Sequence, residues 1–144
     1  MHQAAPLQWS ASLAALAQGW AATLAARGCG AELEHSAPGE LLYWETGDDT
    51  RCRYAVDSWY SEAVFYNFDT PSPFADNVMF GSNDVSHFTQ LVWAASTQVG
   101  CGLQVAGPYS RRCMFVACRF AVPGNSRSDV AHLVNVLPKV GSRR

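Results

Sequence analysis

Charged residues are scarce in this sequence, and lysine is almost absent. Asp, Glu, Lys and Arg make up 15% of the 144 residues, whereas they make up about a quarter of an average domain. Lys139 is the only lysine among ten basic residues, and the formal net charge is −2. This composition excludes a nucleic-acid-binding domain, which needs a basic surface, and a coiled coil, whose exposed faces are rich in charge.

Long apolar runs are missing as well. No uninterrupted run reaches the ~18 residues that a membrane span requires, so no transmembrane segment is predicted. The stretch 11–20 is interrupted by polar residues and is not preceded by a positive segment, so we do not interpret it as a signal peptide. With 49% apolar residues, the chain is predicted to fold as one domain, residues 1–144, with a substantial core.

The motifs of common catalytic and metal sites are also absent. The sequence contains no H-E-x-x-H, no G-x-S-x-G, no P-loop, no G-x-G-x-x-G and no C-x-x-C. These absences exclude zinc ribbons and thioredoxin-like redox sites. The five cysteines are scattered, which fits either a secreted domain with two disulfides and one odd thiol or a cytosolic protein with five reduced cysteines. They are Cys29, Cys52, Cys101, Cys113 and Cys118.

Helical and strand patterns alternate along the chain. Leu13, Leu16, Trp20 and Leu24 recur at helical spacing, which predicts an amphipathic helix over 10–26 that ends before Gly28. Two further helices are predicted, from Asp49 or Thr50 to about 66 and over 86–95, and strands are predicted over 40–45, 99–106 and 113–122. Helices interleaved with a few antiparallel strands indicate a layered α/β or α+β domain.

Two histidines and two glutamates could together form a site: His35, Glu40, Glu62 and His87. Two imidazoles can share a divalent metal, and carboxylates can orient them or position a water. From spacing alone, the alternative of core histidines and solvent-facing glutamates is favoured. The remaining histidines, His2 and His132, are predicted to lie at the surface. The same is predicted of three arginine pairs, at 51 and 53, 111 and 112, and 143 and 144.

Blocks ordered along the chain resemble the CAP superfamily, which comprises the cysteine-rich secretory, antigen 5 and plant pathogenesis-related proteins. The segments 86–93 (SHFTQLVW) and 96–102 (STQVGCG) resemble the first signature of the family, and 118–125 (CRFAVPGN) resembles the second. Further blocks at 6–24, 34–41 and 59–62 are similar to the family's earlier segments, and 135–138 (NVLP) resembles the end of fungal-type members. The resemblance covers about residues 6–138.

The resemblance implies an α+β fold, a three-layer α-β-α sandwich with a small antiparallel sheet between helices. The family usually begins with a His-Asn…Arg block that this chain does not contain, so the implied fold lacks part of the N-terminal helix. The family's central cavity carries two His and two Glu, which match His35, Glu40, Glu62 and His87. The two histidines would be the ligands of a divalent cation such as zinc or magnesium, and no organic cofactor is implied.

The resemblance also implies disulfides and a compartment. Cys101 and Cys118 match a family disulfide, Cys29–Cys113 is a second candidate pair, and Cys52 is left without a partner. Each bridge would contribute roughly 2–4 kcal/mol. The family relationship implies an extracellular, secreted protein, with the signal peptide removed or missing.

Sterol-exporting yeast members of the family carry an aromatic, proline-containing loop before the second histidine. The segment 65–74 (FYNFDTPSPF) resembles it, so Phe65, Tyr66, Phe68, Pro71 and Phe74 are candidate lipid contacts. Flat rings in a surface loop could cover a planar apolar ligand. The alternative is that these rings pack onto the preceding helix.

The function that we expect is therefore binding of a sterol or another small lipid by a secreted protein. One alternative is an extracellular defence or interaction effector whose loops bind another protein. Another is a metal-assisted hydrolase, in which a metal on His35 and His87 activates water and Glu40 or Glu62 acts as the base. Two protein ligands make a looser zinc site than the usual three of catalytic zinc, so an enzyme is the less favoured alternative.

Overall fold

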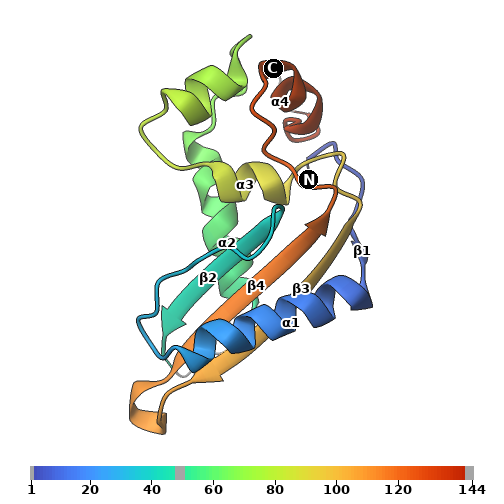
Figure 1. Cartoon of the computed structure of the whole chain (residues 1–144). Coiled ribbons are helices and arrows are strands. Elements are labelled where there is room, and N and C mark those ends of the chain that lie inside the picture. Colours follow the sequence, from blue (N-terminus) through green and yellow to red (C-terminus); the bar gives the residue numbers. More distant parts are fainter. Residues whose placement is uncertain (1, 48–50, 142–144) are drawn as a thin grey trace.

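Four strands form one sheet in the order β1-β3-β4-β2 (Figure 1). The structure is a computed structural model that describes residues 2–47 and 51–141. The strands are β1 (Gln8–Trp9), β2 (Glu40–Thr46), β3 (Gln98–Ala106) and β4 (Cys113–Ala121). Strands β2 and β3 both pair antiparallel to β4, as predicted, but β1 runs parallel to β3. The prediction of a purely antiparallel sheet is therefore wrong at this edge, because the extended segment before the first helix adds a short strand.

Three of the four described α-helices follow the predicted pattern, with shorter bounds, and the last one was not predicted. The described α-helices are α1 (Ala11–Ala26), α2 (Arg53–Ser61), α3 (Ser86–Leu91) and α4 (Asp129–Asn135). The second helix continues as a 3-10 turn, η1 (Glu62–Phe65), and the segment predicted as a loop contains a π-helical turn, η2 (Ala75–Met79). A further 3-10 turn, η3 (Tyr109–Arg111), lies in the β3–β4 hairpin. The N-cap predicted at Asp49 or Thr50 lies outside the described residues.

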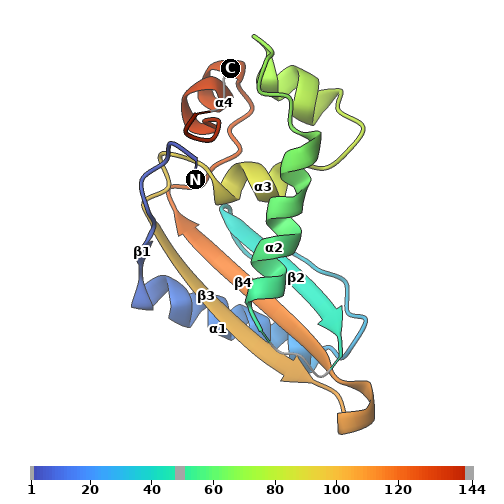
Figure 2. The same cartoon turned by 180° about the vertical axis from the view of Figure 1, so that it is seen from behind.

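Helix α1 lies across one face of the sheet, and α2 covers the opposite face (Figures 1 and 2). Successive side chains of β4 point to opposite faces of the sheet. Phe115 and Ala117 pack toward α1, whereas Met114 and Val116 pack with Trp59 of α2. The predicted three-layer α-β-α arrangement is thus confirmed.

The buried face of α1 differs from the predicted one. Ala17, Ala21 and Ala25 are buried together with Leu24, whereas Leu16 is 56% exposed. Small alanine side chains occupy the buried face because the helix backbone lies directly against β3. The helix begins where the sequence predicts, since Ser10 is the N-cap and its hydroxyl accepts a hydrogen bond from the Leu13 N–H.

A third cluster joins α3, α4 and the segment after α2, and it contains a histidine predicted to lie at the surface. His132 on α4 is only 1% exposed, because it packs between Trp93 and Phe74 and lies 3.5 Å from the Tyr66 hydroxyl. Burial lowers the pKa of His132, so the fold favours the neutral form of its imidazole. Short helices with one buried polar position carry too little periodicity to reveal such a residue.

The other terminal histidine, His2, is also better connected than predicted. It is half-buried, its Nδ1 lies 2.6 Å from the Leu137 carbonyl oxygen, and its Nε2 lies 2.9 Å from the Tyr60 hydroxyl. An isolated antiparallel β-bridge between His2 and Lys139 pairs the two ends of the described chain. His2 was predicted to lie at the surface, but it is half-buried and links the N-terminal segment to the C-terminal one.

Both proposed disulfides are present. Cys101 and Cys118 face each other across β3 and β4 with Cα atoms 4.0 Å apart, and Cys29–Cys113 joins the segment after α1 to the start of β4. Cys52 is an exposed free thiol. Among the residues that the structure describes, no helix has the length and apolarity needed to cross a membrane.

Candidate functional site

The four predicted site residues include two carboxylates. Glu40, at the start of β2, is the more deeply buried of the two. Its side chain is fully buried, and it accepts hydrogen bonds from the Ser36 N–H and hydroxyl, each at 2.8 Å, and from Arg119 Nε at 3.0 Å. The His35 Nδ1 lies 3.8 Å from the same carboxylate, but the His35 ring is 55% exposed. These hydrogen bonds fix the Glu40 carboxylate against the loop that carries Ser36 and His35.

Glu62 and His87 form the second pair. The His87 Nδ1 lies 2.7 Å from Glu62 Oε1, and Glu62 Oε2 accepts a hydrogen bond from the Phe88 N–H at 3.0 Å. The His87 ring stacks on Trp59 with an interplanar angle of 11°. The hydrogen bond to Glu62 raises the pKa of His87 against the opposing effect of burial, and the nearby Asp84 adds to the increase. This pair therefore favours a charged imidazole.

The four residues form two separate pairs, His35 with Glu40 and His87 with Glu62. Strand alternation places the Glu40 side chain on the face that α1 covers, whereas His87 contacts Trp59 in the cluster beneath α2. Within residues 2–47 and 51–141, no group of three or more His, Cys, Asp or Glu side chains could hold a metal ion. Each carboxylate faces a Nδ1, the arrangement by which an outer group orients an imidazole ligand, so each Nε2 is the nitrogen that could face a cation. Zinc or magnesium binding by His35 and His87 stays a prediction.

Sequence reasoning missed Arg119 and Ser36, which complete the first pair. Arg119 lies directly opposite Glu40 in the β2–β4 register, and it also donates to the Ser36 hydroxyl. A buried carboxylate on a strand needs a positively charged partner. The arginine within the second family signature was the sequence feature that could have predicted this partner.

Glu62→Gln is expected to destabilise the domain by about 1 kcal/mol at pH 6 and by much less at pH 8.5. Because the folded pKa of His87 is raised, its stabilising charge is fully present below the unfolded pKa of about 6.5 and is lost as the pH rises through the folded value. Glutamine can still accept the Phe88 N–H. Urea denaturation of both proteins at the two pH values measures the difference.

His132 serves as an internal control for this comparison. Its lowered pKa destabilises the fold as the pH falls below the unfolded value, but it does so in the wild type and in Glu62→Gln alike. The difference between the two proteins therefore reports on His87. An equal difference at pH 6 and pH 8.5 would contradict a charged His87–Glu62 pair.

The predicted lipid-loop residues divide into buried and exposed ones. Tyr66 is buried and packs on Phe68 and Phe88, and Phe74 packs on His132, so part of the loop completes the third cluster. Phe65 is 56% exposed, Pro71 is exposed, and Phe68 is half-buried. The alternative was packing onto the preceding helix, whereas Tyr66 contacts Phe88 of α3 and Phe74 contacts His132 of α4. Phe65 and Phe68 remain accessible.

A largely apolar pocket of about 380 Å³ opens beside Phe68. Its lining includes Tyr60, Ala63 and Val64 of α2 and η1 together with Pro138 and Lys139 from the C-terminal segment. The Lys139 ammonium lies 5.6 Å from the centre of the Tyr60 ring. The pocket therefore combines apolar walls with a few polar groups at its rim, which is the usual make-up of a small-molecule site.

Comparison with known proteins identifies relatives in one family. The model of the cysteine-rich secretory protein family, CAP, matches residues 1–120. Pathogenesis-related protein 1C of Nicotiana tabacum is 34% identical over 122 residues, which are 83% of this chain and 66% of that protein. Protein PRY2 of Saccharomyces cerevisiae is 33% identical over 137 residues, which are 92% of this chain and 35% of that protein. The chain thus spans about two thirds of the length of the tobacco relative and about one third of the yeast one.

Solved structures agree with this relationship. The structure of BmVAL-1 superposes with a TM-score of 0.67 at 25% identity, over 85% of this chain and 61% of that one. NaASP2, solved with Zn²⁺, superposes with a TM-score of 0.60 at 18% identity, over 88% of this chain and 65% of that one. The fold described above is therefore the fold of these proteins.

Proposed function

Because the chain belongs to the cysteine-rich secretory protein (CAP) family, we propose that it is a secreted CAP domain that binds a sterol or another small lipid beside α2 and η1. Two disulfides fit an extracellular compartment, where such bonds form and persist. Relatives that are named pathogenesis-related proteins support a role in extracellular defence.

The observation that carries this proposal is a group of exposed apolar side chains on η1 and η2. Val64 is 79% exposed and Phe80 is 75% exposed, and Phe65 and Met79 are each more than half exposed. The Asn77 side chain links η2 to the segment that follows η1, because it donates to the Asn67 carbonyl and accepts from the Asn67 N–H. Exposed apolar groups gathered in this way on a small protein usually mark a binding surface.

The adjoining pocket suits a lipid with one polar end. Apolar walls from Ala63, Val64 and Phe68 would contact a flat hydrocarbon body, and its volume of about 380 Å³ lies within the range of ~300–1,000 Å³ typical of small-ligand sites. The Ser61 hydroxyl and the Asp69 carboxylate at the rim could hydrogen-bond a single hydroxyl group. A sterol combines these two features in one rigid molecule, which limits the entropy lost on binding.

Equilibrium binding of a fluorescent sterol and of a labelled fatty acid to the purified domain tests this proposal. Phe65→Ser is expected to weaken binding at least fivefold, because it removes an exposed apolar ring from η1, the turn whose Val64 lines the pocket. The matched control is Leu16→Ser, since Leu16 is also 56% exposed but lies on α1, away from this surface. Wild-type protein that binds neither lipid, or equal losses in the two variants, would overturn the proposal.

Glu62→Gln separates lipid binding from chemistry at the histidines. Since Glu62 contacts His87 and the Phe88 N–H, lipid affinity is expected to stay within twofold of the wild type in this variant. A large loss of lipid affinity in Glu62→Gln with retained folding would place the ligand at the histidine pairs instead.

A further inference from the structure

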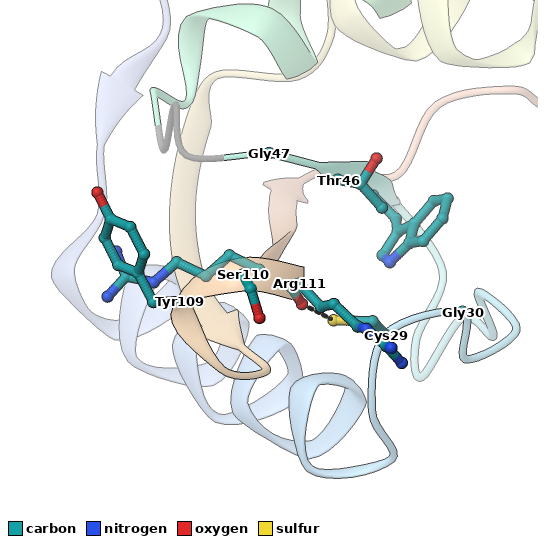
Figure 3. Close-up of a pocket in the computed structure, with 9 residues that line it drawn as sticks. Cys29, Gly30, Thr46, Gly47, Tyr109, Ser110 and Arg111 are labelled. Carbon is teal, nitrogen blue, oxygen red and sulfur yellow. Dashed lines mark hydrogen bonds between the residues drawn. The ribbon is translucent and has the colours of Figure 1, made fainter.

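A large pocket lies at the end of the sheet away from α3. It has a volume of about 860 Å³ and opens between the end of β2 and the β3–β4 hairpin (Figure 3). Its principal lining side chains are Cys29, Trp44, Thr46, Tyr109, Arg111 and Arg112. Neither the apolar surface on η1 and η2 nor the two histidine pairs contribute to it, so neither accounts for it.

Two arginines make this pocket basic. Among the residues that the structure describes, neither Arg111 nor Arg112 forms an ion pair, and the lining contains no acidic side chain. The Arg112 guanidinium lies 4.7 Å from the centre of the Tyr109 ring. Stacking uses the face of the guanidinium and leaves its N–H edge able to donate.

The remaining lining residues add aromatic surface and hydroxyl groups. Trp44 and Tyr109 supply rings, and Thr46 and Ser110 supply hydroxyls that can donate or accept. The Trp44 Nε1–H is buried without an acceptor among the described residues, and a buried donor of this kind is rare unless water or a ligand satisfies it. The site therefore offers flat apolar faces together with a surplus of donors.

The pocket is held in shape by covalent and backbone contacts. The Cys29–Cys113 disulfide ties the lining residue Cys29 to the start of β4, and the Gly47 N–H donates to the Arg112 carbonyl at 3.0 Å. Figure 3 shows Cys29 beside Arg111, and the Arg111 carbonyl oxygen lies 3.4 Å from the Cys29 sulfur. The turn that presents both arginines is closed by a hydrogen bond from the Arg111 N–H to the Pro108 carbonyl at 2.8 Å. A ligand would meet a surface that is already formed.

We propose that this pocket binds an acidic oligosaccharide, with carboxylates paired to Arg111 and Arg112 and sugar rings against Tyr109 and Trp44. Guanidinium groups bind carboxylates through two parallel hydrogen bonds, and the C–H faces of sugars pack on aromatic rings. Sugar hydroxyls would meet Thr46 and Ser110. The volume of about 860 Å³ lies near the upper end of small-ligand sites, so it has room for more than one sugar ring.

Other anionic ligands fit the pocket less well. Nucleic acid needs a continuous basic surface, whereas this chain has a net charge of −2 and only two arginines here. Inorganic phosphate would use the arginines but would leave both aromatic faces uncovered. An acidic peptide could pair with the edge strand β2, and the experiment below distinguishes it.

Isothermal titration calorimetry with tetragalacturonate tests the proposal on the whole chain. Saturable binding to the wild type is expected, with a loss of at least tenfold in the double variant R111Q/R112Q. The matched control is R53Q/R127Q, which removes two positive charges from exposed positions outside the pocket and is expected to bind within twofold of the wild type. Thermal unfolding of each variant confirms that it is folded.

Three further probes define what the site recognises. Neutral maltotetraose, tetraglutamate and inorganic phosphate are each expected to bind at least tenfold more weakly than tetragalacturonate. Absence of tetragalacturonate binding, equal losses in the two double variants, or equally tight binding of any of the three probes would overturn the proposal. Since Phe65 lies on the lipid surface, Phe65→Ser is expected to bind tetragalacturonate normally, which keeps this result independent of lipid binding.

Discussion

Gly102→Ala is expected to lower the free energy of unfolding by about 3 kcal/mol or more, a large share of the ~5–15 kcal/mol that stabilises a typical domain. A Cβ atom at this position of β3 would overlap the backbone of Gln18 and Ala17 on α1. Backbone atoms cannot move aside as a side chain can, so the helix would have to lift from the sheet. The same holds at Gly100, where a Cβ atom would overlap the backbone of the first turn of α1.

Lifting α1 would also break a pair of hydrogen bonds between Gln18 and β3. The Gln18 amide donates to the Leu103 carbonyl and accepts from the Leu103 N–H, each at 3.0 Å. In this way the side chain satisfies an edge of β3 that the two-residue strand β1 does not reach. Loss of these bonds adds to the steric cost and exposes the alanines of α1 to water.

The matched control for Gly102→Ala is Gly19→Ala. Gly19 lies on α1 next to Gln18, but a Cβ atom there would meet nothing within 4 Å. Replacing glycine by alanine inside a helix stabilises it by up to about 1 kcal/mol, so this variant is expected to be at least as stable as the wild type. Urea denaturation measures both proteins. A Gly102→Ala variant within about 1 kcal/mol of the wild type would show that α1 does not depend on this close approach.

Removing the Cys29–Cys113 disulfide is expected to cost about 4–5 kcal/mol, compared with about 3 kcal/mol for Cys101–Cys118. The first bond links residues 84 positions apart in the sequence, and the second links residues only 17 apart. A longer closed loop restricts the unfolded chain more strongly. Cys101 and Cys118 are also already paired by the β3–β4 ladder, whereas Cys29 lies in an irregular segment after α1.

The comparison uses the double variants C29S/C113S and C101S/C118S, so that neither protein contains an additional free thiol. Their free energies of unfolding are measured in urea without a reducing agent. Cys52 is free in both variants and in the wild type, so it does not affect the difference. If C101S/C118S proved the less stable of the two, loop closure would not explain the role of these bonds.

Local patterns in the sequence predicted most of the secondary structure. Ser10 and Gly28 mark the two ends of α1 because a capping hydroxyl and a glycine at φ +93° act within a few residues. Family blocks predicted both disulfides and the layers, since they reflect the whole fold. The strand β1 and the turn η2 were not predictable, because a two-residue strand and a single irregular turn have no periodicity of their own.

For the candidate sites, the sequence determined which groups are present, and the tertiary structure decided what each one contacts. The sequence identified His35, Glu40, Glu62 and His87, but only the fold divides them into two pairs and supplies Arg119 as the partner of Glu40. Arg111 and Arg112 had the pattern of solvated surface charges, and Arg111 is exposed as predicted, but only the fold places both beside the end of β2 in the lining of one pocket. The physical reason is that pairing, burial and enclosure depend on segments far apart in the chain, whose distances are set only when the sheet and its two helical layers are assembled.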